Sequence, residues 1–294
     1  MSDIAQENRQ IAARLTEYAD LLEAQGEDGF RIRAYAAAAH ELEAMPVPVR
    51  DHFQTGGTRA LIALPAIGRG IAAAIAELLT TGHWQQLERL KGSLTPEALF
   101  GTVPGIGPAL ARRLADTLDV ETLEDLETAL RLGETPVPGI GPRRRQAILA
   151  ALEQRLSRIR RDHGPEPAMA EPPVALLLDA DALYRARAEA GGLRKIAPRR
   201  FNPRGHVWLP IMHARRGDWH LTALFSNTAQ AHELDRTRDW VVIYYHENDG
   251  PEGRCTVVTE RSGPLEGKRV IRGREDECRA HYCEVIAAGA KEPV

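Results

Sequence analysis

The sequence has few cysteines and no long apolar run. Its three cysteines fall in the last forty residues, an odd number without zinc-ribbon spacing, so we expect reduced thiols rather than a disulfide framework. No stretch approaches the roughly 18 consecutive apolar residues of a membrane-spanning helix, and residues 1–14 are charged rather than leader-like. We therefore expect a cytoplasmic protein.

Lysine is also scarce, and the formal net charge of -3 lacks the basic excess typical of nucleic-acid binders. The distribution of charge weakens that objection, because residues 143–161 hold seven arginines and a single glutamate. The chain therefore carries a local basic segment near its middle. Lysines occur only at Lys91, Lys195, Lys268 and Lys291.

The 294 residues predict two domains, since a single core rarely grows past about 250 residues. Apolar residues recur at helical spacing over 8–23 and 31–42. Residues 162–173 contain four prolines and no periodicity, which marks a linker. We predict an all-α domain over 1–161 and a second domain over 174–294.

The second domain has the texture of an α+β fold. Short apolar runs separated by Gly, Pro, Asn and Asp predict strands, and two longer segments predict helices. The predicted strands are 174–178, 207–212, 219–225, 240–245 and 255–259, and the predicted helices are 182–190 and 275–287.

A repeated five-residue turn is the most specific feature of the chain. It reads Leu-Pro-Ala-Ile-Gly at 64–68 and Val-Pro-Gly-Ile-Gly at 103–107 and 137–141, and a helix-forming run follows each copy. Proline fixes the entry to the turn, the glycines permit positive φ, and the isoleucine fills the space between two helices. One copy alone would indicate only a tight turn; three copies indicate a function.

The helix after each turn begins with backbone N–H groups that have no partner within the helix, and these favour a phosphate oxygen. Such a grip contacts the sugar-phosphate backbone and reads no base sequence. Ala66 makes the first copy the weakest. The predicted N–H-presenting residues are Gly68, Gly105, Gly107, Gly139 and Gly141, and the predicted charge partners are Arg112, Arg113, Arg143, Arg144 and Arg145.

Residues 1 to about 158 resemble the N-terminal region of bacterial family X DNA polymerases. The resemblance runs through Asn8, the segment 30–35, the three turns and the segment 122–126. It implies a helix-hairpin-helix region that binds gapped, nicked or end-containing DNA in repair, with a monovalent cation at a hairpin turn in some members. It also implies a DNA-binding role for Tyr35.

Two departures argue against the family's catalytic activities. Members with lyase activity attack the sugar aldehyde with a lysine on the helix after the first turn, and here that position is Ala74, which cannot form an imine. Lys91 is the only lysine before the linker and lies well beyond that helix. After residue 160 the sequence has no Gly-Ser turn followed by spaced aspartates, the pattern that would indicate a polymerase palm. We therefore expect neither polymerase nor lyase activity, and we favour a protein that is not an enzyme and has no resident cofactor.

The second domain leaves alternatives open. Asp179 and Asp181, after the predicted strand, could hold magnesium in a nuclease, although we favour Asp181 as the cap of the helix that starts at Ala182. The loop 196–204 carries three arginines and Phe201, which suits nucleic acid or a protein partner. His213 and His220 could face each other across a hairpin, without a third metal ligand at a predictable offset.

Two further groups are weaker candidates. The segment 226–228 indicates a polar turn before a catalytic hydroxyl, and Cys278, His281 and Cys283 lack a fourth metal ligand. We therefore predict a DNA-binding protein without sequence preference, acting in repair. A metal-dependent nuclease is the alternative, and a protein-interaction role for the second domain is a third hypothesis.

Overall fold

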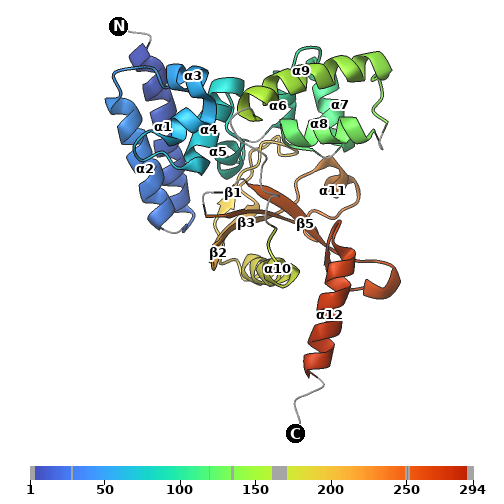
Figure 1. Ribbon diagram of the computed structural model, residues 1–294. Coiled ribbons are helices and arrows are strands. Elements are labelled where there is room, and N and C mark those ends of the chain that lie inside the picture. Colours follow the sequence, from blue (N-terminus) through green and yellow to red (C-terminus); the bar gives the residue numbers. More distant parts are fainter. Residues whose placement is uncertain are drawn as a thin grey trace. The chain divides into compact units, whose positions relative to one another are not determined.

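The chain divides into two compact units in the computed structural model (Figure 1). The structure describes residues 4–27, 29–93, 95–118, 120–133, 136–160, 171–248, 250 and 252–289. The helical unit comprises Met1–Pro167, Ala197–His206 and Thr228–Gln230, and the sheet unit comprises Ala168–Ile196, Val207–Asn227 and Ala231–Val294. Most of the predicted linker, 162–170, lies outside the described residues.

The helical unit is built from consecutive helices, as its periodicity predicts. Their bounds are α1 (Ile4–Ala24), α2 (Gly29–Ala44), α3 (Val49–Ile62), α4 (Arg69–Thr81), α5 (Gln85–Lys91), α6 (Pro96–Phe100), α7 (Pro108–Leu118), α8 (Leu123–Leu132) and α9 (Pro142–Arg160). The helices predicted over 8–23 and 31–42 are confirmed by α1 and α2. Among the described residues, no helix combines the length and apolar character needed to cross a bilayer.

The second half of the helical unit encloses its own apolar core. Leu110 and Leu114 of α7 pack with Leu126 of α8 and with Ile148 and Leu152 of α9. These residues recur at three- and four-residue spacing, which places them on the inward face of each helix. The core therefore fixes the relative positions of α7, α8 and α9, and with them the turns that precede α7 and α9.

The sheet unit contains a six-stranded antiparallel sheet in the simple order β1-β2-β3-β4-β5-β6. The strands are β1 (Lys195–Ile196), β2 (Leu209–Arg216), β3 (Trp219–Phe225), β4 (Val241–Glu247), β5 (Gly253–Thr259) and β6 (Arg269–Ile271). The helices are α10 (Val174–Glu189), the short α11 (Ala229–Glu233) and α12 (Glu275–Gly289). The unit is thus α+β, as predicted.

The helix α10 corrects the prediction of a strand at 174–178. Pro173 occupies the position before the first helical residue, where it costs no hydrogen bond, and the run that follows is rich in alanine and leucine. Leu177 and Tyr184 of α10 join the core with Leu221, Ile243 and Val257 of the sheet. A short run of consecutive apolar residues does not distinguish a strand from a helix, which is why a strand was predicted.

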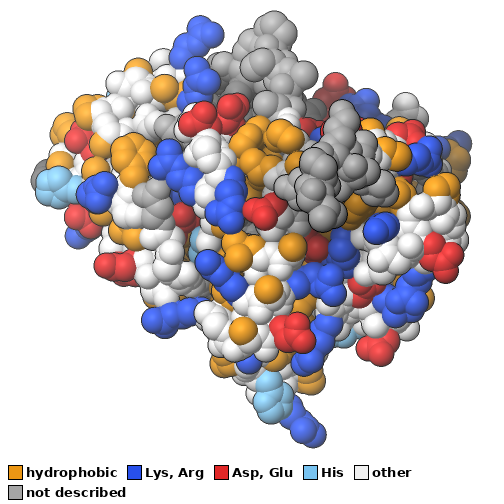
Figure 2. Space-filling view, turned by 90° about the horizontal axis from the view of Figure 1, so that it is seen from below, with side chains coloured by type: hydrophobic (Ala, Val, Ile, Leu, Met, Phe, Trp, Pro, Cys, Tyr) orange, Lys and Arg blue, Asp and Glu red, His pale blue; other side chains and the backbone are white. Residues whose placement is uncertain are grey.

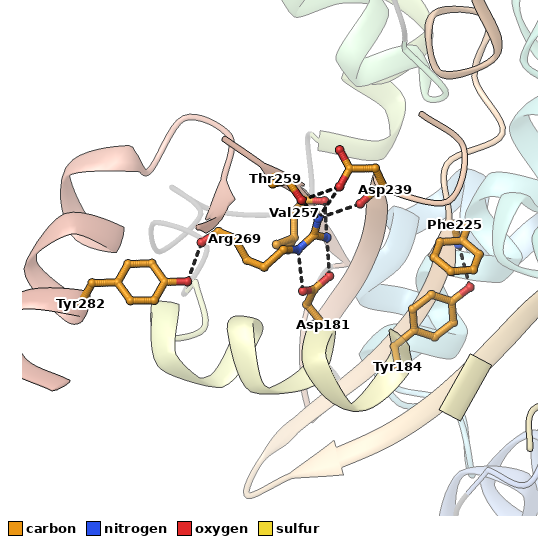
Figure 3. A network of polar contacts seen from close by, with 8 residues as sticks. All are labelled: Asp181, Tyr184, Phe225, Asp239, Val257, Thr259, Arg269 and Tyr282. Carbon is orange, nitrogen blue, oxygen red and sulfur yellow. Dashed lines mark hydrogen bonds and ion pairs between the residues drawn. The ribbon is translucent and has the colours of Figure 1, made fainter. Parts of the chain in front are cut away.

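A buried ion network ties α10 to the sheet (Figure 3). Asp181, which is 1% exposed, accepts hydrogen bonds from the Arg269 guanidinium at 2.7 and 2.9 Å. Arg269 also donates to Asp239 and Thr259, and its carbonyl accepts from Tyr282 of α12 at 2.8 Å. Asp181 is therefore a mid-helix structural residue, and its predicted capping role is wrong.

Candidate nucleic-acid interface

The three repeated turns join successive helices, α3 to α4, α6 to α7, and α8 to α9. Gly105 and Gly139 have the same φ of 87°, in the left-handed region that glycine adopts without steric cost. Ala66 holds the corresponding position of the first turn at a φ of 58° despite its Cβ. The second and third turns therefore share one backbone conformation, and the first reaches a related one under strain.

The second turn presents backbone N–H groups that have no backbone acceptor. The N–H groups of Gly105, Gly107 and Ala109 donate to no backbone carbonyl of the described residues. In contrast, Ile106 and Ile140 donate to the carbonyls of Val103 and Val137, each at 3.1 Å, which closes the two turns identically. Pro108 begins α7 without an N–H group. The exposed donors are thus concentrated at the start of the helix, where the macrodipole attracts an anion.

The third turn repeats this arrangement with more positive charge. The N–H groups of Gly139, Gly141 and Arg143 likewise lack a backbone acceptor among the described residues. Arg143, Arg144 and Arg145 are all exposed in the first turn of α9. Cations at this end of a helix oppose its dipole, so the stability of α9 does not explain Arg143 and Arg144. Arg145 instead reaches the C-terminal end of α8, where its Nη1 atom would be 2.7 Å from a Cβ placed on Gly133.

An arginine from the second hairpin lies over the third turn. A Cβ placed on Gly139 would be 3.1 Å from the Nη2 atom of Arg113, which belongs to α7. Arg144 donates to the carbonyl of Gly139 at 3.2 Å. A side chain of the second hairpin thus lies beside the third turn, a juxtaposition that sequence spacing alone does not reveal. Arg112, also predicted, is exposed on α7.

The first turns of the helices that follow the repeats contain no acidic residue. Acidic residues do occur in the first turns of α1, α3, α5, α6 and α8, where they complement the dipole, whereas α2, α10 and α11 also lack them. Carboxylates are thus absent where an anionic ligand would have to approach. This pattern indicates that the helix starts are kept available for phosphate.

The placement of Tyr35 corrects the expectation that its ring meets DNA. Tyr35 is 5% exposed, and its ring lies 4.6 Å from Tyr18 and 5.7 Å from Trp84, centroid to centroid. The three rings form an aromatic core between α1, α2 and the start of α5. A ring enclosed in this way contributes packing and cannot stack on a base.

The lyase position is equally enclosed. Ala74 is 3% exposed on α4, and Lys91, at the end of α5, pairs with Glu17 at 2.6 Å. Gly68 ends the first turn as the residue before α4, with extended backbone angles.

A groove of about 780 Å³ lies in the helical unit, and no motif in the sequence indicates it. Arg50 and Arg155 line it, together with the kink in α3 at Gly56 and Gly57. Arg155 donates to the carbonyls of Thr80 and Thr102 at 2.8 and 2.6 Å, and Arg50 also pairs with Glu7. These contacts identify both arginines as ties between helices.

The carboxylates proposed for a nuclease do not share a site. Asp179 is exposed and pairs with Arg216 at 3.3 Å, whereas Asp181 is buried against Arg269. No cluster of three His, Cys, Asp or Glu residues suited to a metal ion occurs among the described residues. The structure therefore does not bring this pair together as a magnesium site.

The histidine and cysteine candidates also separate. The β2–β3 register places Thr222, not His220, opposite His213, and their side chains lie 3.0 Å apart. His220 instead stacks on His246 of β4, with ring centroids 4.9 Å apart. Cys278 is buried and accepts from the Ile271 N–H at 3.4 Å, while Cys283 is exposed.

On the face seen in Figure 2, basic and acidic side chains are interspersed.

Comparison with known families agrees with this geometry. Residues 6–84 match the family model described as Helix-hairpin-helix domain, and residues 97–154 match the SAM-like Helix-hairpin-helix tandem. Helix-hairpin-helix domains indicate DNA binding without sequence preference. The first half of this chain is such a region.

The chain is also 31% identical over 160 residues to DNA polymerase lambda of Arabidopsis thaliana. The match covers 52% of this chain and 29% of that polymerase, so it spans less than a third of the relative's length. The helix-hairpin-helix region is thus similar to that of a family X polymerase.

Proposed function

We propose that this protein grips the sugar-phosphate backbone of gapped, nicked or end-containing duplex DNA through its second and third hairpin turns, in DNA repair. The N–H groups of Gly105, Gly107, Gly139 and Gly141 contact phosphate oxygens. Arg113 and the first-turn arginines of α9 add Coulomb attraction that depends on salt. Gly68 contributes a weaker contact, because Ala66 replaces the first glycine of its turn.

The observation that carries the proposal is the exposed arginine triplet at the start of α9. Arg143 and Arg144 lie where the helix dipole disfavours a cation, beside N–H groups without backbone acceptors. A bound phosphate satisfies both features at once, since it accepts from the N–H groups and neutralises the guanidinium groups. DNA repair is supported by the similarity to the polymerase region.

In this proposal the helical unit binds DNA without lyase chemistry. An imine requires an accessible amine at the sugar aldehyde, and Ala74 supplies none. Lys91 is held by Glu17 at the end of α5. The first half would therefore position DNA rather than cleave it.

A monovalent cation fits the second turn better than the third. Among the described residues, no hydrogen-bond donor reaches the carbonyls of Pro104 and Gly105, whereas the Gly139 carbonyl already accepts from Arg144. We expect potassium, if it strengthens binding, to act at the second turn. Replacing potassium by lithium should then change the DNA affinity of a Gly105→Val variant less than that of the wild type.

Alanine at Gly107 and at Gly141 tests the proposal. Neither glycine has a positive φ, and a Cβ at either position meets no heavy atom within 4 Å, so both variants should fold normally. The added methyl groups would nevertheless lie beside the proposed phosphate contacts. Gly192→Ala in the sheet unit is the matched control, because its Cβ would have its nearest neighbour at 3.8 Å.

Fluorescence anisotropy with gapped duplex DNA measures the outcome. We expect each turn variant to lower affinity by about 10-fold or more, the scale of one lost charge-assisted hydrogen bond, and Gly192→Ala to leave it unchanged. Equal affinities for all three variants and the wild type would overturn the proposed grip.

A further inference from the structure

Residues 197–206 form a loop that belongs to the helical unit and is anchored at several points. The backbone N–H of Arg199 donates to the Gly92 carbonyl at 2.6 Å. The Arg200 guanidinium pairs with Asp116 of α7 and, at 3.2 Å, with Glu97 of α6. The loop is therefore fastened to the two helices of the second hairpin.

Asn202 braces the remainder of the loop from within. Its side-chain amide donates to the His206 carbonyl at 2.7 Å, and its side-chain oxygen accepts from the His206 N–H at 3.0 Å. Asn202 is only 9% exposed. Arg200 and Asn202 thus both point inward and hold the segment between them in a defined conformation.

Phe201, between these two anchors, is held outward in a strained conformation. It is 46% exposed and has a φ of 54°, a left-handed angle that is uncommon for a bulky side chain. The Arg200 guanidinium carbon lies 4.9 Å from the centroid of its ring. A left-handed φ at a bulky residue costs free energy, and such strained residues cluster at functional sites.

The surroundings of Phe201 favour a nucleic acid over an apolar partner. Arg199 and Arg204 lie two residues before and three residues after Phe201 in the loop and are both exposed. Asp116 lies eight residues after Pro108 in α7, so the anchor is about 12 Å along the helix from the second turn. The anchor of the loop therefore lies within the span of a few nucleotides from a phosphate bound at that turn.

We propose that Phe201 stacks on an unpaired or terminal base of the DNA strand held by the second hairpin, with Arg199 and Arg204 contacting the neighbouring phosphates. This inference rests on the proposed function. It adds a preference for gaps and ends, because every base offers a π-face for stacking but only an unpaired or terminal base exposes one.

The test compares Phe201→Ala, Phe201→Asn and Phe201→Trp in the full chain. Asparagine tolerates the left-handed φ, so it separates the loss of the ring from backbone strain. Phe30→Ala is the matched control, since Phe30 is another exposed phenylalanine of the helical unit, on α2. Anisotropy is measured with gapped, single-stranded and blunt duplex DNA, and thermal unfolding by circular dichroism.

We expect the Ala and Asn variants to lose about 5- to 150-fold in affinity for gapped and single-stranded DNA, the range for one stacked base. Blunt duplex should lose much less, and tryptophan should retain the wild-type preference. Equal losses on all three DNAs, or no more loss than Phe30→Ala, would overturn the stacking role.

The proposed function has a separate readout in the Gly107→Ala and Gly141→Ala variants. If these lose affinity while the Phe201 variants do not, the hairpin grip stands and the stacking inference fails. If the Phe201 variants lose affinity while the glycine variants do not, Phe201 contacts DNA, but the hairpin assignment fails and with it the placement of that base on a strand held by the second hairpin. A wild-type protein that binds none of the DNAs at moderate salt would overturn both.

Discussion

Replacement of the three first-turn arginines of α9 by glutamine should separate DNA affinity from stability. Each protein contact that neutralises a duplex phosphate contributes about 0.9 to the slope of log affinity against log salt. If Arg143, Arg144 and Arg145 each contact a phosphate, the triple variant should lose about 2.7 from that slope. Between 50 and 200 mM salt, the affinity of the wild type should therefore fall about 40-fold more than that of the variant.

Stability should respond in the opposite direction. The arginines oppose the dipole of α9, and their removal relieves about 0.3–1 kcal/mol each at low ionic strength. Loss of the Arg144 contact with the Gly139 carbonyl offsets part of this gain. We thus expect a thermal midpoint equal to or above that of the wild type, measured by circular dichroism.

A charge-matched control distinguishes local contact from net charge. Arg185, Arg187 and Arg279 are exposed in the sheet unit, and changing them to glutamine alters the formal charge by the same amount. Arginine-to-lysine replacement in α9 should largely restore the slope, because the charge remains. The reasoning is refuted if both triple glutamine variants change the slope equally, or if the α9 variant leaves it unchanged.

Three further predictions concern chemistry and stability. Borohydride reduction with DNA that carries a 5'-deoxyribose phosphate should trap no covalent adduct, and an adduct would show that a displaced amine acts. Arg269→Leu should lower the free energy of unfolding by about 3–5 kcal/mol, because it leaves the buried Asp181 carboxylate unpaired. Arg272→Leu, which removes a half-exposed pair, is the control and should lower it by about 1 kcal/mol or less. Urea titration measures both free energies of unfolding. Burial raises the pKa of Cys255 to about 12, so only about one Cys255 thiol in 10,000 is ionised at pH 8. Maleimide should therefore label the exposed Cys283 long before Cys255. Comparable labelling rates, measured by mass spectrometry, would contradict the burial of Cys255.

Much of the helical unit could be predicted because its signals are local. Proline and glycine at fixed offsets specify each turn, and three- and four-residue spacing specifies the helices on either side. The positions of Gly105 and Gly139 followed from these rules. The burial of Tyr35 did not, since it depends on Tyr18 and Trp84, which lie on other elements.

The sheet unit was less predictable because its decisive contacts are distant in sequence. Asp181 and Arg269 are 88 residues apart, so neither residue's neighbours indicate a buried pair. Arg113 over Gly139 is a similar case within the helical unit. The strand predicted at 174–178 was wrong because a helix packed on a sheet can be apolar over a whole turn.

The loop that carries Arg200 bears on how the chain can be shortened. A protein truncated after residue 161 would retain every hairpin turn but lose the guanidinium that neutralises Glu97 and Asp116. Two uncompensated carboxylates would then lie on the helices of the second hairpin, where they would repel a phosphodiester backbone. Weak DNA binding by such a fragment would reflect this missing neutralisation, and restoring it with Glu97→Gln and Asp116→Asn would reveal the intrinsic affinity of the turns.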